Sequence, residues 1–117
     1  MTLRLTPDVL RTAYDFLRVT MPFKGWKLPP GEEVEFIVSL DRHTIGTHTT
    51  YQWRPQEHVI GVSQHGVGHT STLIKIMAHE MVHAAQVQAG GPNTHNFDFG
   101  QRAKLVCRHH GFDLKEF

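Results

Sequence analysis

One stretch, residues 72–89, constrains the fold of this chain more than any other. It is apolar around most of a helical projection at roughly 100° per residue, so we expect a buried helix. Within it stand His79, Glu80 and His83, in the pattern H-E-x-x-H. Residues four apart lie one above the other on a helix, so both imidazoles can face a single cation. A metal ion with its water would satisfy these buried polar groups, which otherwise need partners in the protein.

The pattern also assigns a separate position to the carboxylate. Glu80 points roughly 100° away from His79 around the helix, so it can reach a water on the ion without binding the ion itself. This arrangement is typical of a catalytic zinc site, where three protein ligands leave one position open. The alternative is a structural pair of histidines without a metal, since the chain contains ten His.

The third ligand is expected beyond the helix. Gln86 and Ala89 occupy the positions where a continuous H-E-x-x-H-x-x-G-x-x-H site requires Gly and His. The run 90–92, Gly-Gly-Pro, is a signal for the helix to end and the chain to turn back. His95 follows this break and is the preferred third ligand, because zinc favours imidazole here. Asp98, one turn further along, is the alternative.

The remaining segments predict an α+β fold. Thr6, Pro7 and Asp8 are typical of a helix start, and apolar residues at helical spacing predict a helix over 7–21. A last helix is expected after Asn93 and Thr94. Runs rich in β-branched and aromatic residues predict a small, mostly antiparallel three-stranded sheet with strands at 33–39, 45–53 and 58–63.

Length and composition restrict the class of protein. The 117 residues fit a single domain, 1–117, and 39% hydrophobic content is that of a globular chain. A net charge of +1 predicts no strong field for nucleic acid or membrane. Cys107 stands alone, which excludes an internal disulfide and a Cys-rich zinc ribbon. The N-terminus carries no apolar run typical of a signal peptide or membrane span, so a cytoplasmic location is expected.

The residues around the motif resemble a known family. The run 79–84, His-Glu-Met-Val-His-Ala, then a Gly-containing turn and the run 95–99, His-Asn-Phe-Asp-Phe, are similar to the SprT-like (Spartan-related) zinc metallopeptidases, whose active helix is followed by a His-Gly-x-x-Phe element. The resemblance implies a zincin-like fold, with Zn²⁺ bound by His79, His83 and His95. It also implies peptide-bond hydrolysis through a zinc-activated water, with Glu80 as general base.

Two differences from the family limit what the resemblance implies. Asn96 stands where the family pattern has Gly, and the C-terminal zinc ribbon of many members is absent, so this would be a minimal form. The family suggests DNA-associated proteins as substrates. DNA binding by the chain itself is expected to be weak, with Arg102, Lys104 and Arg108 as a local basic face. The alternative function is a catalytically weak or inactive metal-stabilised module that binds protein or DNA.

Substrate binding can also be predicted in outline. An extended peptide is expected to add a strand to an exposed sheet edge, that of 59–63, with little side-chain selectivity. Four further residues are expected in or next to the strands and loop around the cleft. Any of them is a candidate to stabilise an oxyanion, and the sequence does not distinguish among His48, Tyr51, His65 and His69.

Overall fold

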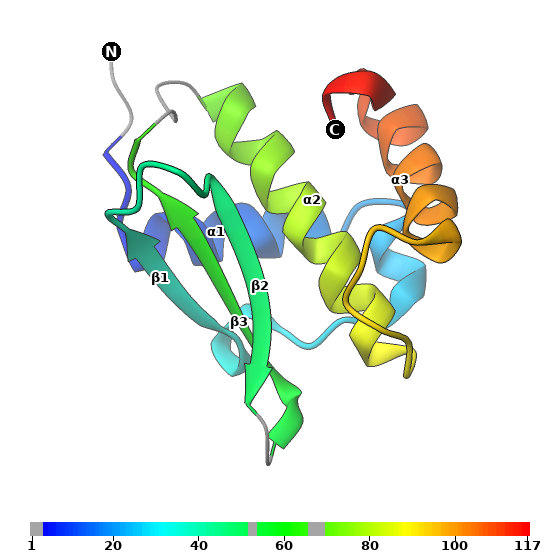
Figure 1. Ribbon diagram of the computed structural model, residues 1–117, viewed down its shortest axis with the longest axis horizontal. Coiled ribbons are helices and arrows are strands. Elements are labelled where there is room, and N and C mark those ends of the chain that lie inside the picture. Colours follow the sequence, from blue (N-terminus) through cyan, green and yellow to red (C-terminus); the bar gives the residue numbers. More distant parts are fainter. Residues whose placement is uncertain (1–3, 52–53, 66–69) are drawn as a thin grey trace.

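The described part of the chain contains a three-stranded sheet and three α-helices (Figure 1). The structure, a computed structural model, describes residues 4–51, 54–65 and 70–117. The helices are α1 (Pro7–Arg18), α2 (Thr70–Gln88) and α3 (Phe97–His110). The strands are β1 (Glu35–Ser39), β2 (Gly46–Tyr51) and β3 (Arg54–Ser63). The α+β class expected from the sequence is therefore confirmed. Among the described helices, none combines the length and apolar character needed to cross a membrane.

The sheet is mixed, so the expectation of a mostly antiparallel sheet is wrong. Its strand order is β1-β3-β2, with β1 parallel to β3 and β2 antiparallel to β3. The short connection between β2 and β3 gives the antiparallel pair. The segment 40–45, however, leads the chain to the far side of β3 rather than into a hairpin with β1. Period-two alternation gives each strand its buried face but contains no information on strand order, which is why the sequence did not reveal this topology.

The strand order also corrects the predicted docking edge. Residues 59–63 belong to the central strand, whose backbone pairs with β1 on one side and β2 on the other. The free edges of this sheet are β1 and β2. Of these, β2 lies alongside α2, the helix that contains the H-E-x-x-H pattern (Figure 1).

The helix boundaries follow local signals. Thr6 caps α1 as expected, since its Oγ1 accepts a hydrogen bond from the Val9 N–H at 3.1 Å. The helix ends at Arg18, before the predicted end at 21. Strand β3 begins at Arg54 rather than at 58. The predicted end of the second strand, 52–53, lies outside the described residues.

Helices α1 and α2 cover one face of the sheet, and α3 packs on α2 on the side away from the sheet (Figure 1). This position buries α2 on most of its circumference, as its apolar pattern predicted. Its side chains Met77, Met81 and Val82 are fully buried in the core. The helix thereby holds the H-E-x-x-H residues on a rigid, packed element.

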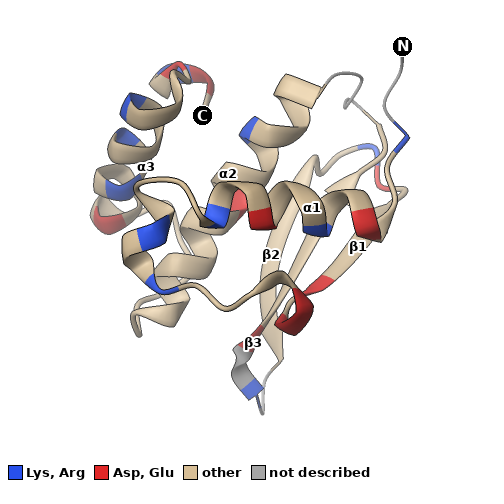
Figure 2. Ribbon diagram, turned by 180° about the vertical axis from the view of Figure 1, so that it is seen from behind, with Lys and Arg blue, Asp and Glu red and all other residues tan. Residues whose placement is uncertain are grey.

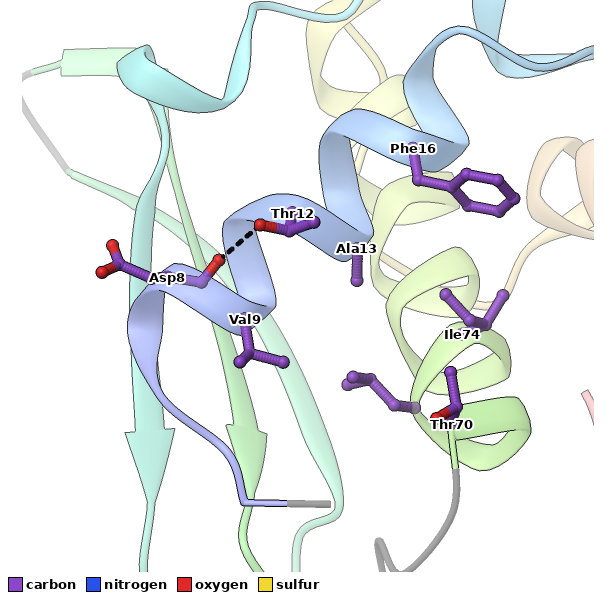
Figure 3. A pocket seen from close by; sticks show the side chains of 8 residues that line it. Asp8, Val9, Thr12, Ala13, Phe16, Thr70 and Ile74 are labelled. Atoms are coloured by element: carbon purple, nitrogen blue, oxygen red, sulfur yellow. Dashed lines mark hydrogen bonds between the residues drawn. The ribbon is translucent and has the colours of Figure 1, made fainter.

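An apolar groove separates the N-terminal end of α2 from α1. Val9, Ala13 and Phe16 line it from α1, opposite Thr70 and Ile74 of α2 (Figure 3). Its volume is about 570 Å³. The groove includes no residue of the H-E-x-x-H pattern, which lies further along α2.

Candidate metal centre

Three histidines that the sequence singled out lie together. His79 and His83 come from one face of α2, and His95 comes from the segment between α2 and α3. The Nε2 atom of His95 lies 3.2 Å from Nε2 of His83 and 3.2 Å from Nε2 of His79. All three ligand atoms lie within 4.8 Å of one another, close enough to bind one metal ion.

The chain reversal that places His95 follows from the glycines after α2. Gly90 has φ +88°, a left-handed conformation that favours glycine. The N–H of Gly90 donates to the Val87 carbonyl at 2.9 Å, and the N–H of Gly91 donates to the Gln86 carbonyl at 2.8 Å. This pair of bonds is a Schellman motif, which ends the helix and turns the chain back. The reversal predicted from the Gly-Gly-Pro run is confirmed.

Gln86 orients one ligand and ties down the segment that carries another. It is 1% exposed, and its Nε2 donates to the Thr94 carbonyl at 2.9 Å and to Asn96 Oδ1 at 3.0 Å. Because a backbone carbonyl can only accept, the amide is fixed with Oε1 facing His83 Nδ1 at 2.8 Å. His83 therefore carries its proton on Nδ1, and its Nε2 lone pair points into the cluster.

The tail of the chain fixes the other helical ligand in the same way. Nδ1 of His79 donates to the main-chain oxygen of Phe117 at 2.7 Å, so the His79 Nε2 lone pair is also free. Two lone pairs thus converge on His95 Nε2, which has at most one proton to donate. A shared cation satisfies all three nitrogens. With metal–nitrogen bonds of about 2.0–2.1 Å, tetrahedral ligands stand about 3.3–3.4 Å apart. This is close to the 3.2 Å observed for the two pairs that include His95, and all three ligand atoms lie within 4.8 Å of one another.

Burial keeps the helical ligands neutral. Desolvation lowers the pKa of His79 to about 4, against a smaller opposing effect of the Phe117 main-chain oxygen. Desolvation also lowers the pKa of His83. Imidazole must be neutral to bind a metal, so both groups are ready to act as ligands at neutral pH.

Glu80 is a buried carboxylate beside the cluster. It is 5% exposed, and desolvation raises its pKa to about 7. Gly46, the first residue of β2, passes close to it: a Cβ on Gly46 would lie 2.8 Å from Glu80 Oε2 and 2.8 Å from Ile76 Cγ2. Only a residue without a side chain lets β2 approach the carboxylate this closely. Glu80 and His79 line two adjoining cavities of about 400 and 290 Å³.

The alternative ligand is engaged elsewhere. Asp98 accepts a hydrogen bond from Arg102 Nε at 3.0 Å and does not belong to the histidine cluster. The Arg102 guanidinium also lies over the Trp26 ring, 5.0 Å from its centroid. Of the three basic residues proposed to form a face on α3 (Figure 2), only Lys104 and Arg108 are therefore exposed.

His48 shares a cavity with the cluster, but its ring is already occupied. It is 5% exposed, with Nε2 2.8 Å from Nδ1 of His58 and Nδ1 3.2 Å from Asn93 Nδ2. The Asn93 amide also donates to the His48 carbonyl at 2.8 Å, which fixes its orientation. Because both ring nitrogens have partners, His48 ties the segment before His95 to the sheet and offers no free donor to the cavity.

The other oxyanion candidates do not join the cluster either. The hydroxyl of Tyr51 donates to the carboxylate of Glu35. His65 is half-buried just after β3, and its backbone N–H donates to Ser63 Oγ at 3.1 Å. His69 lies outside the described residues. The structure thus gives no oxyanion-stabilising role to the residues that it describes among the four.

Sequence reasoning missed three contributors to the site: Gln86, Gly46 and Phe117. Gln86 could have been found, because it lies three residues after His83 on the same helix and is polar in a buried position. Gly46 carries no distinguishing signal at the start of a strand. Phe117 acts through its main-chain oxygen, which any residue would supply, so its identity could not reveal this contact.

Comparison with known proteins found no protein-family model, curated protein or solved structure that matches this chain. The likeness to SprT-like metallopeptidases therefore stays a prediction.

Proposed function

We propose that this protein is a zinc-dependent metallopeptidase with a zincin-like fold. One observation carries the proposal: the three Nε2 atoms of His79, His83 and His95 converge beside Glu80, a buried carboxylate that is not part of the ligand cluster. The same residues line cavities large enough to admit a substrate chain.

The donor set favours a catalytic ion over a structural one. Structural zinc sites are closed by four protein ligands, whereas catalytic sites have three and leave one position open. Within the described residues, no fourth His, Cys, Asp or Glu joins the cluster. Three neutral imidazoles suit zinc, for which this ligand set is common.

Each role in peptide-bond hydrolysis can be assigned to one group of the site. Zinc, when bound, acidifies a coordinated water and polarises a carbonyl oxygen. Glu80 accepts a proton from the attacking water and passes it to the leaving amine. Burial raises the pKa of Glu80 to about 7 in the metal-free protein, and the charge of a bound zinc would lower it again, which favours the ionised carboxylate that accepts the proton. Gln86 and the Phe117 main-chain oxygen keep the Nδ1 protons of His83 and His79 in place, so both rings present Nε2 to the ion.

Strand β2 is the best edge for an extended substrate. Its residues Gly46, Thr47 and Thr49 line the cavity that contains the three histidines, and Gly46 also lines the cavity next to Glu80. Because the Asn93 amide already binds the His48 carbonyl, a peptide would pair with this edge around Gly46, which lines both cavities together with His79 and Glu80.

The deciding experiment compares the zinc-loaded wild type with Glu80→Gln. Removing the general base is expected to lower cleavage of a denatured protein by at least about 100-fold while zinc content stays the same. Glu32→Gln, at an exposed position remote from the cluster, is the matched control and should cleave like the wild type.

Two outcomes would go against the proposal. Wild-type cleavage by zinc-loaded Glu80→Gln would show that Glu80 is not the base. Failure of the zinc-loaded wild type to cleave any peptide or denatured protein would favour the alternative function, a metal-stabilised binding module.

A further inference from the structure

Two histidines of the sheet form a buried pair next to the metal centre. His48 of β2 is 5% exposed and His58 of β3 is 1% exposed, and His48 Nε2 lies 2.8 Å from His58 Nδ1. His58 does not belong to the ligand cluster. We infer that His58 is a positioning residue for the metal centre: through His48 and Asn93 it holds the segment of the third ligand in place and so raises the affinity for zinc.

The register of β2 and β3 brings the two rings together. His48 pairs with Ile60 and His58 pairs with Thr50. Paired residues share a face of a sheet, and so do residues two apart along one strand, so both rings lie on the same face as diagonal neighbours. Ile60 is fully buried, which identifies this as the face that packs on α2.

One backbone carbonyl fixes the direction of every hydrogen bond of this pair. Nδ2 of Asn93 lies 2.8 Å from the His48 carbonyl oxygen, which can only accept, and 3.2 Å from His48 Nδ1. Because the same NH₂ group donates to Nδ1, the proton of His48 lies on Nε2, which donates it to His58 Nδ1. His58 then carries its own proton on Nε2, 2.9 Å from Gln88 Oε1. Both rings are therefore neutral, and both nitrogens of each ring have a partner.

This network ends at the segment between α2 and α3. Asn93 lies two residues before His95, which is exposed, so the position of this ligand depends on the hydrogen bonds that hold its backbone. Gln86 holds the same segment from α2. The segment is thus fixed from two sides, by Gln86 from the helix and by His48 from the sheet.

Removing the acceptor on His58 breaks the network at a distance from the ligands. His58→Leu keeps a side chain of similar volume but leaves the Nε2–H of His48 buried without a partner, which is costly. The His48 ring then gains by rotating, and rotation takes Nδ1 away from Asn93. The segment loses one of its hydrogen bonds to the sheet, and the third ligand is held less well.

The test measures zinc affinity by competition with a chromophoric chelator, and stability by urea unfolding of the metal-free protein. His58→Leu should bind zinc about tenfold more weakly, the lower end of the range for supporting residues, because His58 acts through two other side chains. His58→Asn is the rescue variant: its Oδ1 replaces Nδ1 as the acceptor for His48, so its zinc affinity should be close to that of the wild type. Ile60→Val is the matched control, a buried change on the same face that lowers stability without removing a hydrogen bond, and it should leave zinc affinity unchanged.

A residue that only packs would give the opposite order, because Asn fills less of the His58 site than Leu does. Side-chain ¹H–¹⁵N NMR of the metal-free protein adds a direct readout, in which both His48 and His58 should carry their proton on Nε2. Wild-type zinc affinity in folded His58→Leu, equally weak binding by His58→Asn, or a proton on Nδ1 of either ring would overturn the inference.

The inference rests on the zinc site of the proposed function but not on turnover. A wild type that binds zinc and cleaves no peptide or denatured protein would end the peptidase proposal and leave the role of His58 standing. A wild type that does not bind zinc would end both.

Discussion

Gln86 offers the sharpest single perturbation of the metal centre. Gln86→Met preserves the length of the side chain but removes the acceptor for His83 Nδ1 and the donors to Thr94 and Asn96. Without the acceptor, His83 can rotate or change tautomer, and the segment that contains His95 loses two of the hydrogen bonds that hold it to α2. Loss of such a supporting contact weakens metal binding by about 10- to 100-fold, or about 1.4–2.7 kcal/mol.

The same change affects folding of the metal-free protein. Three hydrogen bonds at about 0.5–1.5 kcal/mol each predict a loss of about 1.5–4.5 kcal/mol in the free energy of unfolding. Zinc affinity is measured by competition with a chromophoric chelator, and stability by urea unfolding in the presence of EDTA. Gln101→Met, an exposed glutamine on α3, is the control and should match the wild type in both. A folded Gln86→Met protein that binds zinc as tightly as the wild type would refute the orienting role.

Two further predictions concern Glu80 and the buried histidines. Gly46→Ala should lower kcat at least about tenfold, because the new Cβ, 2.8 Å from Glu80 Oε2, displaces the base. The control is Gly100→Ala, because no atom lies within 4 Å of the Cβ that it adds. A wild-type kcat for Gly46→Ala would contradict the packing of Gly46 against Glu80. Burial lowers the pKa of His48 to about 3 in the folded protein, whereas an unfolded histidine has a pKa of about 6.5. Between these two pH values His48 binds a proton only in the unfolded chain, so the free energy of unfolding falls as the pH falls. Burial of Glu80 raises its pKa to about 7 and acts in the opposite direction, so the test is a comparison with His48→Gln in metal-free protein. From pH 7.5 to pH 5.5 the wild type should lose about 1.4 kcal/mol more than the variant, and an equal loss in both would show that His48 is not held neutral.

The parts of the site that the sequence predicted are those fixed by local geometry. A helix sets the relative directions of residues four apart, so His79 and His83 could be assigned to one face from spacing alone. The Gly-Gly-Pro run gave the chain reversal, because few residues other than glycine adopt φ near the +88° of Gly90. The sequence therefore predicts that His95 lies near the helical pair.

The parts that the sequence did not predict depend on tertiary contacts. The order β1-β3-β2 is a property of the path between strands, which the alternation within each strand does not record. In the sequence, Asn96 stands out only because the SprT-like pattern has glycine at this position. In the fold its Oδ1 accepts from the Phe99 N–H at the start of α3 and from Gln86 Nε2, both at 3.0 Å. One side chain thus caps a helix and connects it to the metal centre.

A crystal structure of the zinc-loaded protein, with anomalous data at the zinc edge, tests the proposed metal centre itself. We expect one zinc ion bound by Nε2 of His79, His83 and His95 at about 2.0–2.1 Å, with a fourth ligand that is not a protein side chain. A zinc ion bound elsewhere, or a fourth protein ligand completing the site, would contradict it.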